Sequence, residues 1–172
     1  MTVTNVRKDA TALTMTVASE WDAPIARVWQ LWADPRKLER WWGPPTYPAT
    51  VVKHEFRPGG NVSYFMTGPG GDQQHGWWKV TKVEEPHRLD FDDGFAESEG
   101  NPDDKMPTMQ FAVTLTELPT GATRMSSRRG SLRARRWTRC SRWAWRRAWP
   151  PPTAKSPTFS PPADSLGWSV PG

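Results

Sequence analysis

Cysteine is almost absent from this 172-residue chain, whose one thiol, Cys140, lies in the C-terminal part. Residues 1–125 therefore form neither a disulfide nor a thiolate metal site, as is typical of proteins kept in a reducing cytoplasm. Long apolar runs are absent too. No segment approaches the ~18 consecutive apolar residues of a membrane span, and the first residues have no apolar signal core. We expect a cytoplasmic protein with no membrane span.

Acidic residues are nearly absent from the last part of the chain. Residues 126–172 hold ten Lys and Arg with one acid, Asp164, whereas residues 1–125 hold 13 Lys and Arg with 17 Asp and Glu. The overall net charge of +5 therefore comes entirely from the tail. The mildly acidic first part has no broad basic face of the kind that nucleic acid requires, so we expect no specific nucleic-acid partner.

Side chains typical of catalysis are few, and none forms a recognisable motif. The three histidines, His54, His75 and His87, lack the spacing of metal ligands. The adjacent acids at 84–85 and 92–93 diverge in extended backbone, which favours solvent-exposed loop edges over paired catalytic carboxylates. The sequence thus predicts no catalytic group, no metal and no cofactor, in a protein that is not an enzyme.

The N-terminal third predicts one strand and two short helices. Residues 12–20 alternate apolar and polar side chains, which indicates a half-buried strand. Asp22 is placed to cap a following helix, in which apolar side chains recur at helical spacing over 25–32. The Asp34–Pro35 pair ends this helix, because a residue before proline is pushed out of the helical region. A second short helical piece follows over 36–42.

The rest of residues 1–125 shows the period-two pattern of β structure, broken by Gly- and Pro-rich turns. Strands are predicted at 51–56, 61–67, 76–83, 88–91, 109–118 and from 122 onward. The polar stretch 92–107 predicts a mobile acidic loop. One strand, two short helices and then several antiparallel strands indicate an α+β fold in which a curved sheet wraps a helix.

Four motifs, read in order, resemble those of one family. They are the helix opening at 23–29, the tryptophan signature Trp41, Trp42, Gly43 and Pro44, the hairpin at 57–60, and the turn at 83–89. From about residue 12 to 125 the sequence resembles the SRPBCC, or START-related, superfamily, and within it the homologues of the activator of heat-shock-protein ATPase. The resemblance implies a helix-grip fold, in which a curved antiparallel sheet and a long C-terminal helix enclose a cavity. It implies one START-like domain over 1–125 that binds a small hydrophobic ligand.

The cavity that the resemblance implies would be lined mainly by aromatic side chains. The predicted ligand-binding residues are Trp42, Phe65, Trp78 and Met109, and the predicted partner is a small apolar molecule. Neighbouring side chains on a strand point to opposite faces, so only one of Tyr64 and Phe65 points inward, and only one of the pair 77–78. The sequence leaves open which one.

Two other functions stay open for residues 1–125. The signature at 41–44 could equally form an interaction surface for a partner such as a chaperone, although the second domain that engages the chaperone in the family's eukaryotic members is absent here. Related folds include polyketide cyclases, so a cyclase-like enzyme is the second alternative.

The tail changes abruptly at Ser126 to Arg, Trp, Pro and Ser, which indicates a shifted reading frame that begins between about Met125 and Arg129. Trp has the single codon TGG, and a codon start one base earlier turns it into a Met, Val or Leu codon. With Cys140 converted in the same way, apolar residues would stand at 137, 140, 143, 145 and 149, close to a helical stripe. The tail as written, 126–172, is expected to be disordered and to replace the family's long helix. Alternatively, a natural Arg- and Trp-rich tail would bind anionic membranes or nucleic acid.

Overall fold

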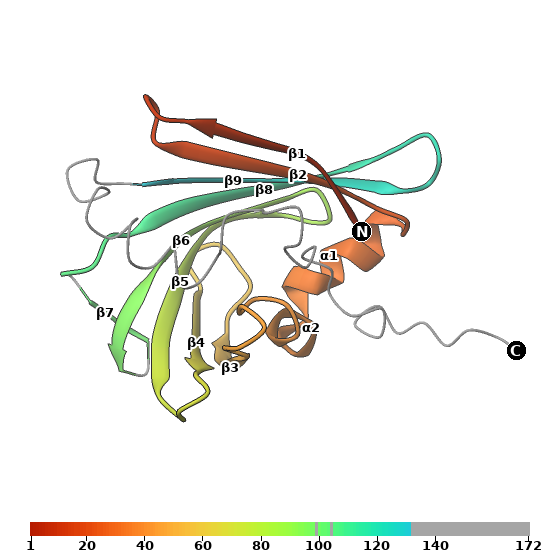
Figure 1. Ribbon diagram of the computed structural model, residues 1–172. Helices are drawn as coiled ribbons and strands as arrows, with labels where there is room; N and C mark the ends of the chain where they lie inside the picture. Colours follow the sequence, from red (N-terminus) through yellow and green to blue (C-terminus); the bar gives the residue numbers. More distant parts are fainter. Residues whose placement is uncertain (99, 104, 132–172) are drawn as a thin grey trace, which may run out of the picture.

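The computed structural model describes residues 1–98, 100–103 and 105–131, and within them one antiparallel sheet curves around two helices (Figure 1). Its strands are β1 (Thr2–Asp9), β2 (Thr14–Trp21), β3 (Ala49–His54), β4 (Asn61–Thr67), β5 (Gln73–Glu84), β6 (Arg88–Ser98), β7 (Asn101–Pro102), β8 (Met109–Glu117) and β9 (Thr123–Ser131). This confirms the predicted α+β helix-grip architecture. The predicted domain boundary at residue 125 falls inside β9, and the predictions for 132–172, including the missing long helix, lie outside the described residues.

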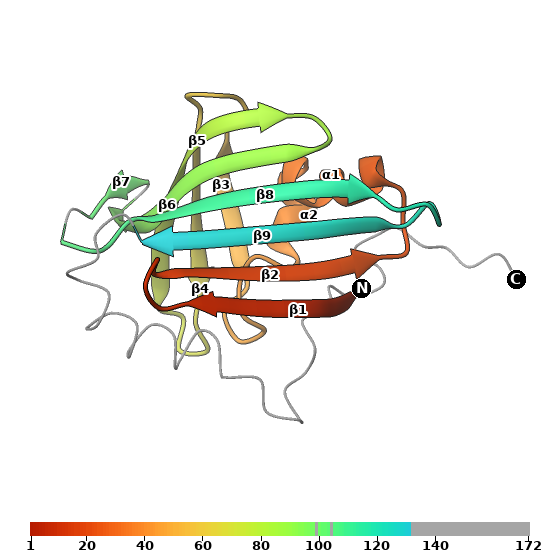
Figure 2. The ribbon, with the colours of Figure 1, turned by 90° about the horizontal axis from the view of Figure 1, so that it is seen from above.

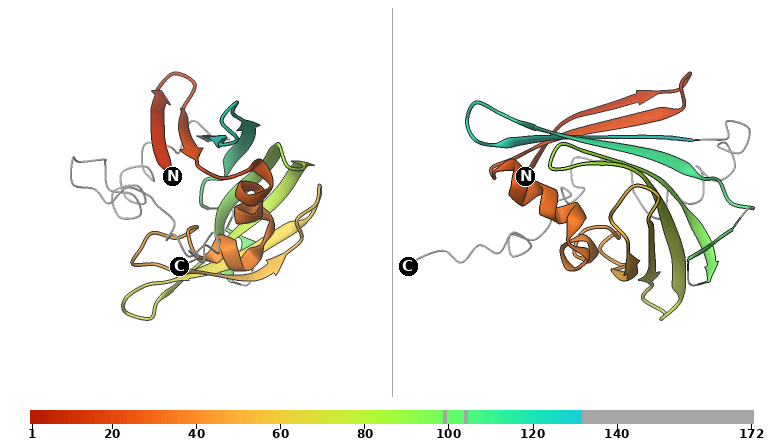
Figure 3. Two further views of the ribbon diagram at one scale, coloured as in Figure 1. Left: turned by 90° about the vertical axis from the view of Figure 1, so that its right-hand side faces the viewer. Right: turned by 180° about the vertical axis from the view of Figure 1, so that it is seen from behind.

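Strand order brings distant parts of the chain together. The sheet runs β1-β2-β9-β8-β6-β5-β4-β3, and the short β7 pairs with β6 (Figure 2). Because β9 inserts between β2 and β8, the first and last described strands lie near the same edge. The part of the sheet from β6 to β3 curls over the helices (Figure 3). The sheet therefore has a concave face, partly filled by the helices, and a convex face.

The first helix, α1 (Ile25–Ala33), lies on the concave side and turns Ile25, Val28, Trp29, Leu31 and Trp32 into the core. The prediction that Asp22 caps this helix is wrong. Pro24 takes the N-cap position, and its carbonyl accepts the N–H groups of Arg27 and Val28 at 2.9 and 3.2 Å. The extended backbone thus continues past Asp22, and the helix begins without a side-chain cap. Among the described residues, no helix has the length and apolar character to cross a membrane.

The second helix, α2 (Pro35–Glu39), is fixed by a carboxylate at each end. Asp34 ends α1, as predicted, and its Oδ1 accepts the N–H of Arg36 at 2.9 Å to cap α2. Glu39 Oε1 accepts the N–H of Val51 at 2.7 Å, on the edge strand β3. This bond joins the end of α2 to the sheet edge and thereby positions the segment 41–44 that follows.

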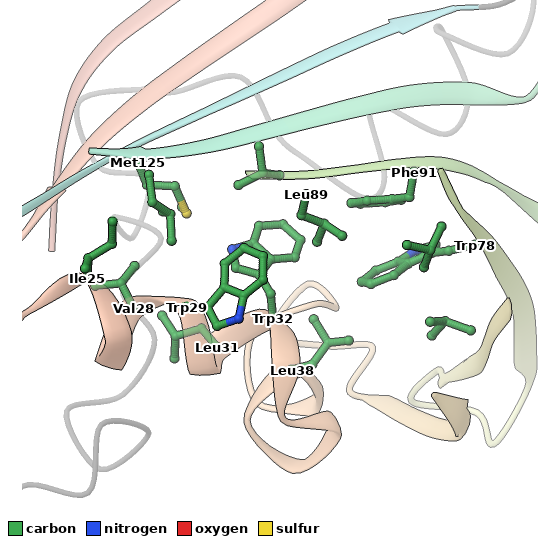
Figure 4. Close-up of a cluster of buried hydrophobic side chains, with 14 of the residues drawn as sticks. Ile25, Val28, Trp29, Leu31, Trp32, Leu38, Trp78, Leu89, Phe91 and Met125 are labelled. Atoms are coloured by element: carbon green, nitrogen blue, oxygen red, sulfur yellow. The ribbon is translucent and has the colours of Figure 1, made fainter. Parts of the chain in front are cut away.

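The core lies between the two helices and the concave face of the sheet (Figure 4). The largest side chains with less than 2% exposure are Trp29, Trp78, Phe91, Leu31, Leu38, Leu89 and Leu115. Burial of one such apolar side chain contributes about 1.5–3 kcal/mol. This layer, built from both helices and from β5, β6 and β8, is the main source of stability in the described chain.

Two stretches contain more β structure than predicted. The prediction of a loop over 92–107 is wrong for 92–98 and for 101–102. Strand β6 continues to Ser98, where it pairs with β5 as far as Ala96 and with β8 as far as Asp93, and its end pairs with the short strand β7. Asp92 and Asp93 alternate across the strand, and Asp93 is turned inward with 7% exposure. Strand β1 has no counterpart among the predicted elements. It is exposed along almost its whole length, so its sequence lacks the apolar alternation that identifies a half-buried strand.

The assignment of strand faces predicts unequal effects for two valines. Val62→Ala should lower the free energy of unfolding by about 1–3 kcal/mol, because Val62 is fully buried on the concave face. The control, Val52→Ala, changes a side chain that is 63% exposed. Its effect should stay below about 0.5 kcal/mol. Urea unfolding followed by tryptophan fluorescence measures both, and equal losses would contradict the assignment.

Candidate functional site

An aromatic cluster covers the concave face beside the helices. We define the aromatic cluster as Trp42, Tyr64, Trp78, Phe91 and Phe111. The ring centroid of Trp42 lies 4.6 Å from that of Trp78, and 6.0, 6.2 and 5.9 Å from those of Tyr64, Phe91 and Phe111. Phe91 stacks on Trp78 at 4.2 Å and on Phe111 at 5.0 Å. Ring pairs at these distances stabilise one another beyond their buried area, so the cluster is a well-packed apolar wall.

The tryptophan signature supplies the centre of this wall. Trp41 donates its indole N–H to the carbonyl of Leu31 at 3.0 Å, which ties the segment after α2 back to α1. Trp42 then turns into the aromatic cluster. Gly43 lies so close to the carbonyl of Tyr47 that a Cβ atom would overlap it. The close approach of these two backbone segments therefore requires glycine directly after the two tryptophans.

Strand β4 turns Tyr64, and not Phe65, into the aromatic cluster. Phe65 lies on the convex face, where its ring is 5.9 Å from that of His75. It is therefore separated by the sheet from the other predicted ligand-binding residues. In β5 the inward residue is Trp78, which is fully buried, and Trp77 lies on the convex face.

A glycine opposite Tyr64 makes this orientation possible. Gly76 in β5 is the register partner of Tyr64, and a Cβ atom on Gly76 would overlap the tyrosine ring. The ring thus lies across the neighbouring strand, and its hydroxyl reaches Asp93 in β6.

Met109 and Phe111 form the more open side of the cluster. Both side chains are half-buried and lie on β8, where Met109 is the register partner of Asp93 and Phe111 that of Phe91. Trp42 is half-buried as well. Three of the four predicted ligand-binding residues, Trp42, Trp78 and Met109, therefore share one face.

Asp93 is a candidate functional residue that the sequence reading placed in a loop. The Tyr64 hydroxyl donates a hydrogen bond to its Oδ1 at 2.9 Å. Burial raises the pKa of Asp93 to about 7, although the Tyr64 hydrogen bond, the nearby Trp78 indole and the charge of Arg129 favour the ionised form. A carboxyl group that changes charge near neutral pH thus sits inside an apolar wall. The sequence feature that could have predicted its inward position is the period of two, because residue 93 follows the apolar positions 89 and 91 at the same spacing.

The ionisable neighbours of Asp93 keep their usual charges at neutral pH. Burial and the negative charge of Asp93 raise the pKa of Tyr64 well above its usual range, so its hydroxyl stays a donor. Burial lowers the pKa of Arg129 on β9 to about 10, while Asp93 acts in the opposite direction. Arg129 Nη2 also lies 3.7 Å from the sulfur of Met15.

Three buried indole N–H groups, those of Trp32, Trp42 and Trp78, have no hydrogen-bond partner in the part of the chain that the structure describes. Their rings adjoin, with centroids 6.1 Å apart for Trp32 and Trp42 and 6.3 Å apart for Trp32 and Trp78. Although the Trp78 indole is near enough to Asp93 to affect its charge, its N–H does not reach hydrogen-bonding geometry. A buried donor without a partner costs about 1–3 kcal/mol. The Trp42 and Trp78 indoles favour the ionised form of the Tyr64 hydroxyl, so both approach an acceptor in the site without completing a hydrogen bond.

A hollow of about 400 Å³ lies on the convex face, and its lining includes Lys53, Lys79 and Asp92 together with Val62 and Trp78. Lys79 already donates to the carbonyl of Gly59 at 2.7 Å, and Lys53 pairs with Glu55 at 3.1 Å. The charges that line this hollow are thus largely engaged by neighbouring groups. Trp78 borders both this hollow and the aromatic cluster.

The histidines stay apart in the structure. His54 stacks on Phe56 at 5.2 Å, and burial lowers its pKa. His75 lies on the convex face beside Phe65, and His87 is exposed in the turn between β5 and β6. Within the described ranges, no three His, Cys, Asp or Glu side chains group as a metal ion would require.

Comparison with known proteins identifies the family of the chain that contains this site. The family described as "Activator of Hsp90 ATPase homolog 1-like protein" matches residues 22–150, which is most of the chain. The chain belongs to this family. The matched range contains the whole aromatic cluster and Asp93. No curated protein matches the chain significantly.

Solved structures of three bacterial proteins are similar to this chain. The crystal structure of protein Ms6760 from Mycobacterium smegmatis is 46% identical, with a TM-score of 0.71, over 80% of this chain and 84% of that one. The solution structure of a protein from Arthrobacter aurescens is 44% identical, with a TM-score of 0.76, over 82% of this chain and 81% of that one. The AHSA1 protein from Silicibacter pomeroyi, 19% identical with a TM-score of 0.57 over 69% of this chain and 80% of that one, shares the fold.

The buried carboxyl predicts a stability that falls as pH rises. Asp93 titrates near 7 in the folded chain and near 3.9 when unfolded, so the folded state binds the proton more tightly between these values. Asp93→Asn removes the effect. The stability difference between the native chain and this variant should shift by up to roughly 4 kcal/mol between pH 4 and 7.5, in favour of the variant as pH rises.

Thermal and urea unfolding across this pH range measure the difference. Asp92→Asn changes the neighbouring carboxylate on the convex face and serves as the control, which should keep the pH profile of the native chain. Parallel profiles for the native chain and Asp93→Asn would contradict the buried, proton-binding carboxyl.

Proposed function

We propose that this protein binds a small apolar molecule against the concave face of its sheet, in the cytoplasm and without catalysing a reaction. The observation that carries the proposal is the half-buried state of Trp42, Met109 and Phe111 beside the fully buried Trp78. Apolar side chains left partly accessible on a concave surface are typical of ligand-binding grooves. The flexible thioether of Met109 suits contact with ligands of different shape.

Family membership supports the same proposal. The family resemblance implies a cavity between the sheet and a covering helix, and the aromatic cluster lies on the face that would line such a cavity. Beyond the cluster, Met15 and Val17 on β2 are also half-buried and lie on the concave face. The apolar lining therefore extends from β4 across the sheet to β2.

The contacts of the tryptophan signature favour this function over chaperone binding. The Trp41 indole N–H donates to the carbonyl of Leu31. The rings of Trp41 and Trp32 pack edge to face with their centroids 4.6 Å apart. Trp42 is the centre of the aromatic cluster. The Trp41 side chain is therefore engaged in internal packing, and the accessible part of Trp42 lies on the proposed ligand-binding face.

We further propose that the intact protein covers the concave face with a helix that the shifted frame conceals. The apolar codons recovered at 137, 140, 143, 145 and 149 would give such a helix one apolar stripe. Strand β9 ends at Ser131, so the chain that follows starts beside the partly open side of the concave face, where Met15 and Met109 lie. A helix at this place would bury side chains that are half-exposed in the described chain.

A neutral fluorescent lipophile, N-phenyl-1-naphthylamine, tests ligand binding to the 172-residue chain. We expect saturable binding that Phe111→Ala weakens by ~10-fold or more, because a phenylalanine contact of ~1.5 kcal/mol or more is lost. Phe65→Ala is the matched control, since Phe65 is also a half-buried phenylalanine but lies on the convex face. Equal weakening by both variants would place the binding site elsewhere.

Restoring the reading frame tests the concealed helix. After independent sequencing of the codons for 121–137, a one-base correction near the codon for Ser126 should yield a chain with higher α-helical circular dichroism. It should also raise the free energy of unfolding by at least about 3 kcal/mol, because several apolar side chains become buried. The control is the corrected gene with a stop codon at position 132. A corrected chain no more helical or stable than this control would contradict the proposal.

A further inference from the structure

The polar groups of the aromatic cluster converge on one region. Asp93 faces Trp78 on one side and Met109 on the other in the strand register. The indole N–H groups of Trp42 and Trp78 lack partners among the described residues, and both rings contact the ring of Tyr64, at 6.0 and 6.1 Å. More than 90% of buried polar groups in native proteins are paired. Unpaired donors gathered around one buried carboxyl are therefore a specific feature of this site.

The chemistry of these groups defines what would satisfy them. The indole N–H groups need a hydrogen-bond acceptor. Tyr64 occupies Asp93 Oδ1, which leaves Oδ2 as an acceptor within the described chain. A single hydroxyl group can accept from an indole and donate to Asp93 Oδ2 at once. A carboxylate offers acceptors only, and its charge would be repelled by the ionised Asp93.

We propose that Asp93, Tyr64 and the Trp42 and Trp78 indoles form a recognition point for a neutral hydroxyl group on a flat, otherwise apolar ligand. The inference rests on the proposed ligand-binding function and names the chemical class of the ligand. Tyr64 acts by holding the Asp93 carboxyl in place, and Gly76 by giving the Tyr64 ring its position.

The shape of the site favours a flat ligand. Trp78, Phe91 and Phe111 form a series of stacked rings, with interplanar angles of 27° and 2° between neighbours. Phe111 at the end of this series is half-buried, as is Met109 next to Asp93. A planar ring system placed against Phe111 and Met109 would continue the stack and bring its edge toward Asp93. Arg129 on β9, the register partner of Phe111, borders the same place.

The experiment compares two probes of equal shape, 2-naphthol and naphthalene, by quenching of tryptophan fluorescence in the 172-residue chain. Without a polar partner naphthalene would bind more tightly, because burial of an unpaired hydroxyl costs free energy. We expect 2-naphthol to bind at least ~10-fold more tightly, as two good hydrogen bonds would provide. In Asp93→Asn the advantage of 2-naphthol should fall by ~10-fold, and in Tyr64→Phe by a smaller factor.

Asp92→Asn is the matched control, because Asp92 lies on the convex face, where it lines the hollow beside Lys79. It should leave the preference for 2-naphthol unchanged. Similar binding of the two probes by the native chain would overturn the recognition point while leaving the apolar binding function intact. Loss of the preference in Asp92→Asn as well as Asp93→Asn would overturn the assignment to the concave face. Binding of neither probe would overturn both the binding function and the inference.

Discussion

The packing of two aromatic-rich helices into a curved sheet is the interaction on which the rest of this structure depends. Trp29 and Trp32 of α1 lie in the core on the concave side of the sheet, where Trp32 contacts Trp78 and Phe91 (Figure 4). The sheet curls from β6 to β3 because this end of it wraps the helices, and the curl makes one face concave. The side chains that point to this concave face determine every feature of the candidate site.

The polar exception in this apolar layer gives the site its chemical character. Asp93 is buried because β6 continues past Phe91 with the same alternation of faces. The hydrogen bond from the Tyr64 hydroxyl reduces the free-energy cost of burying this carboxyl. Tyr64 reaches it only because Gly76 lacks a side chain. Buried polar groups stay expensive unless fully paired. A buried carboxyl with indole donors beside it lowers the stability of the fold. This arrangement is better suited to ligand recognition than to stabilising the folded state.

Local patterns in the sequence predicted much of the architecture. The alternation at 109–118 and 61–67 and the helical spacing at 25–32 correspond to β8, β4 and α1. Prediction failed where polarity and structure diverge. Residues 92–98 form a strand although they are polar, because their partner strands β5, β7 and β8 supply the hydrogen bonds. Strand β1 carries no alternation because neither of its faces is buried.

The sequence by itself determined the period of most elements, many of the breaks between them and the family of the fold, because these depend on neighbours within a few residues. Only the tertiary structure decided that Tyr64 and not Phe65 points inward, that Trp78 and not Trp77 joins the cluster, and that Asp93 is buried beside them. A period of two is the same whichever face is turned inward. The choice is made by the curvature of the sheet and by the helices that cover one side of it, both of which arise from contacts between distant parts of the chain.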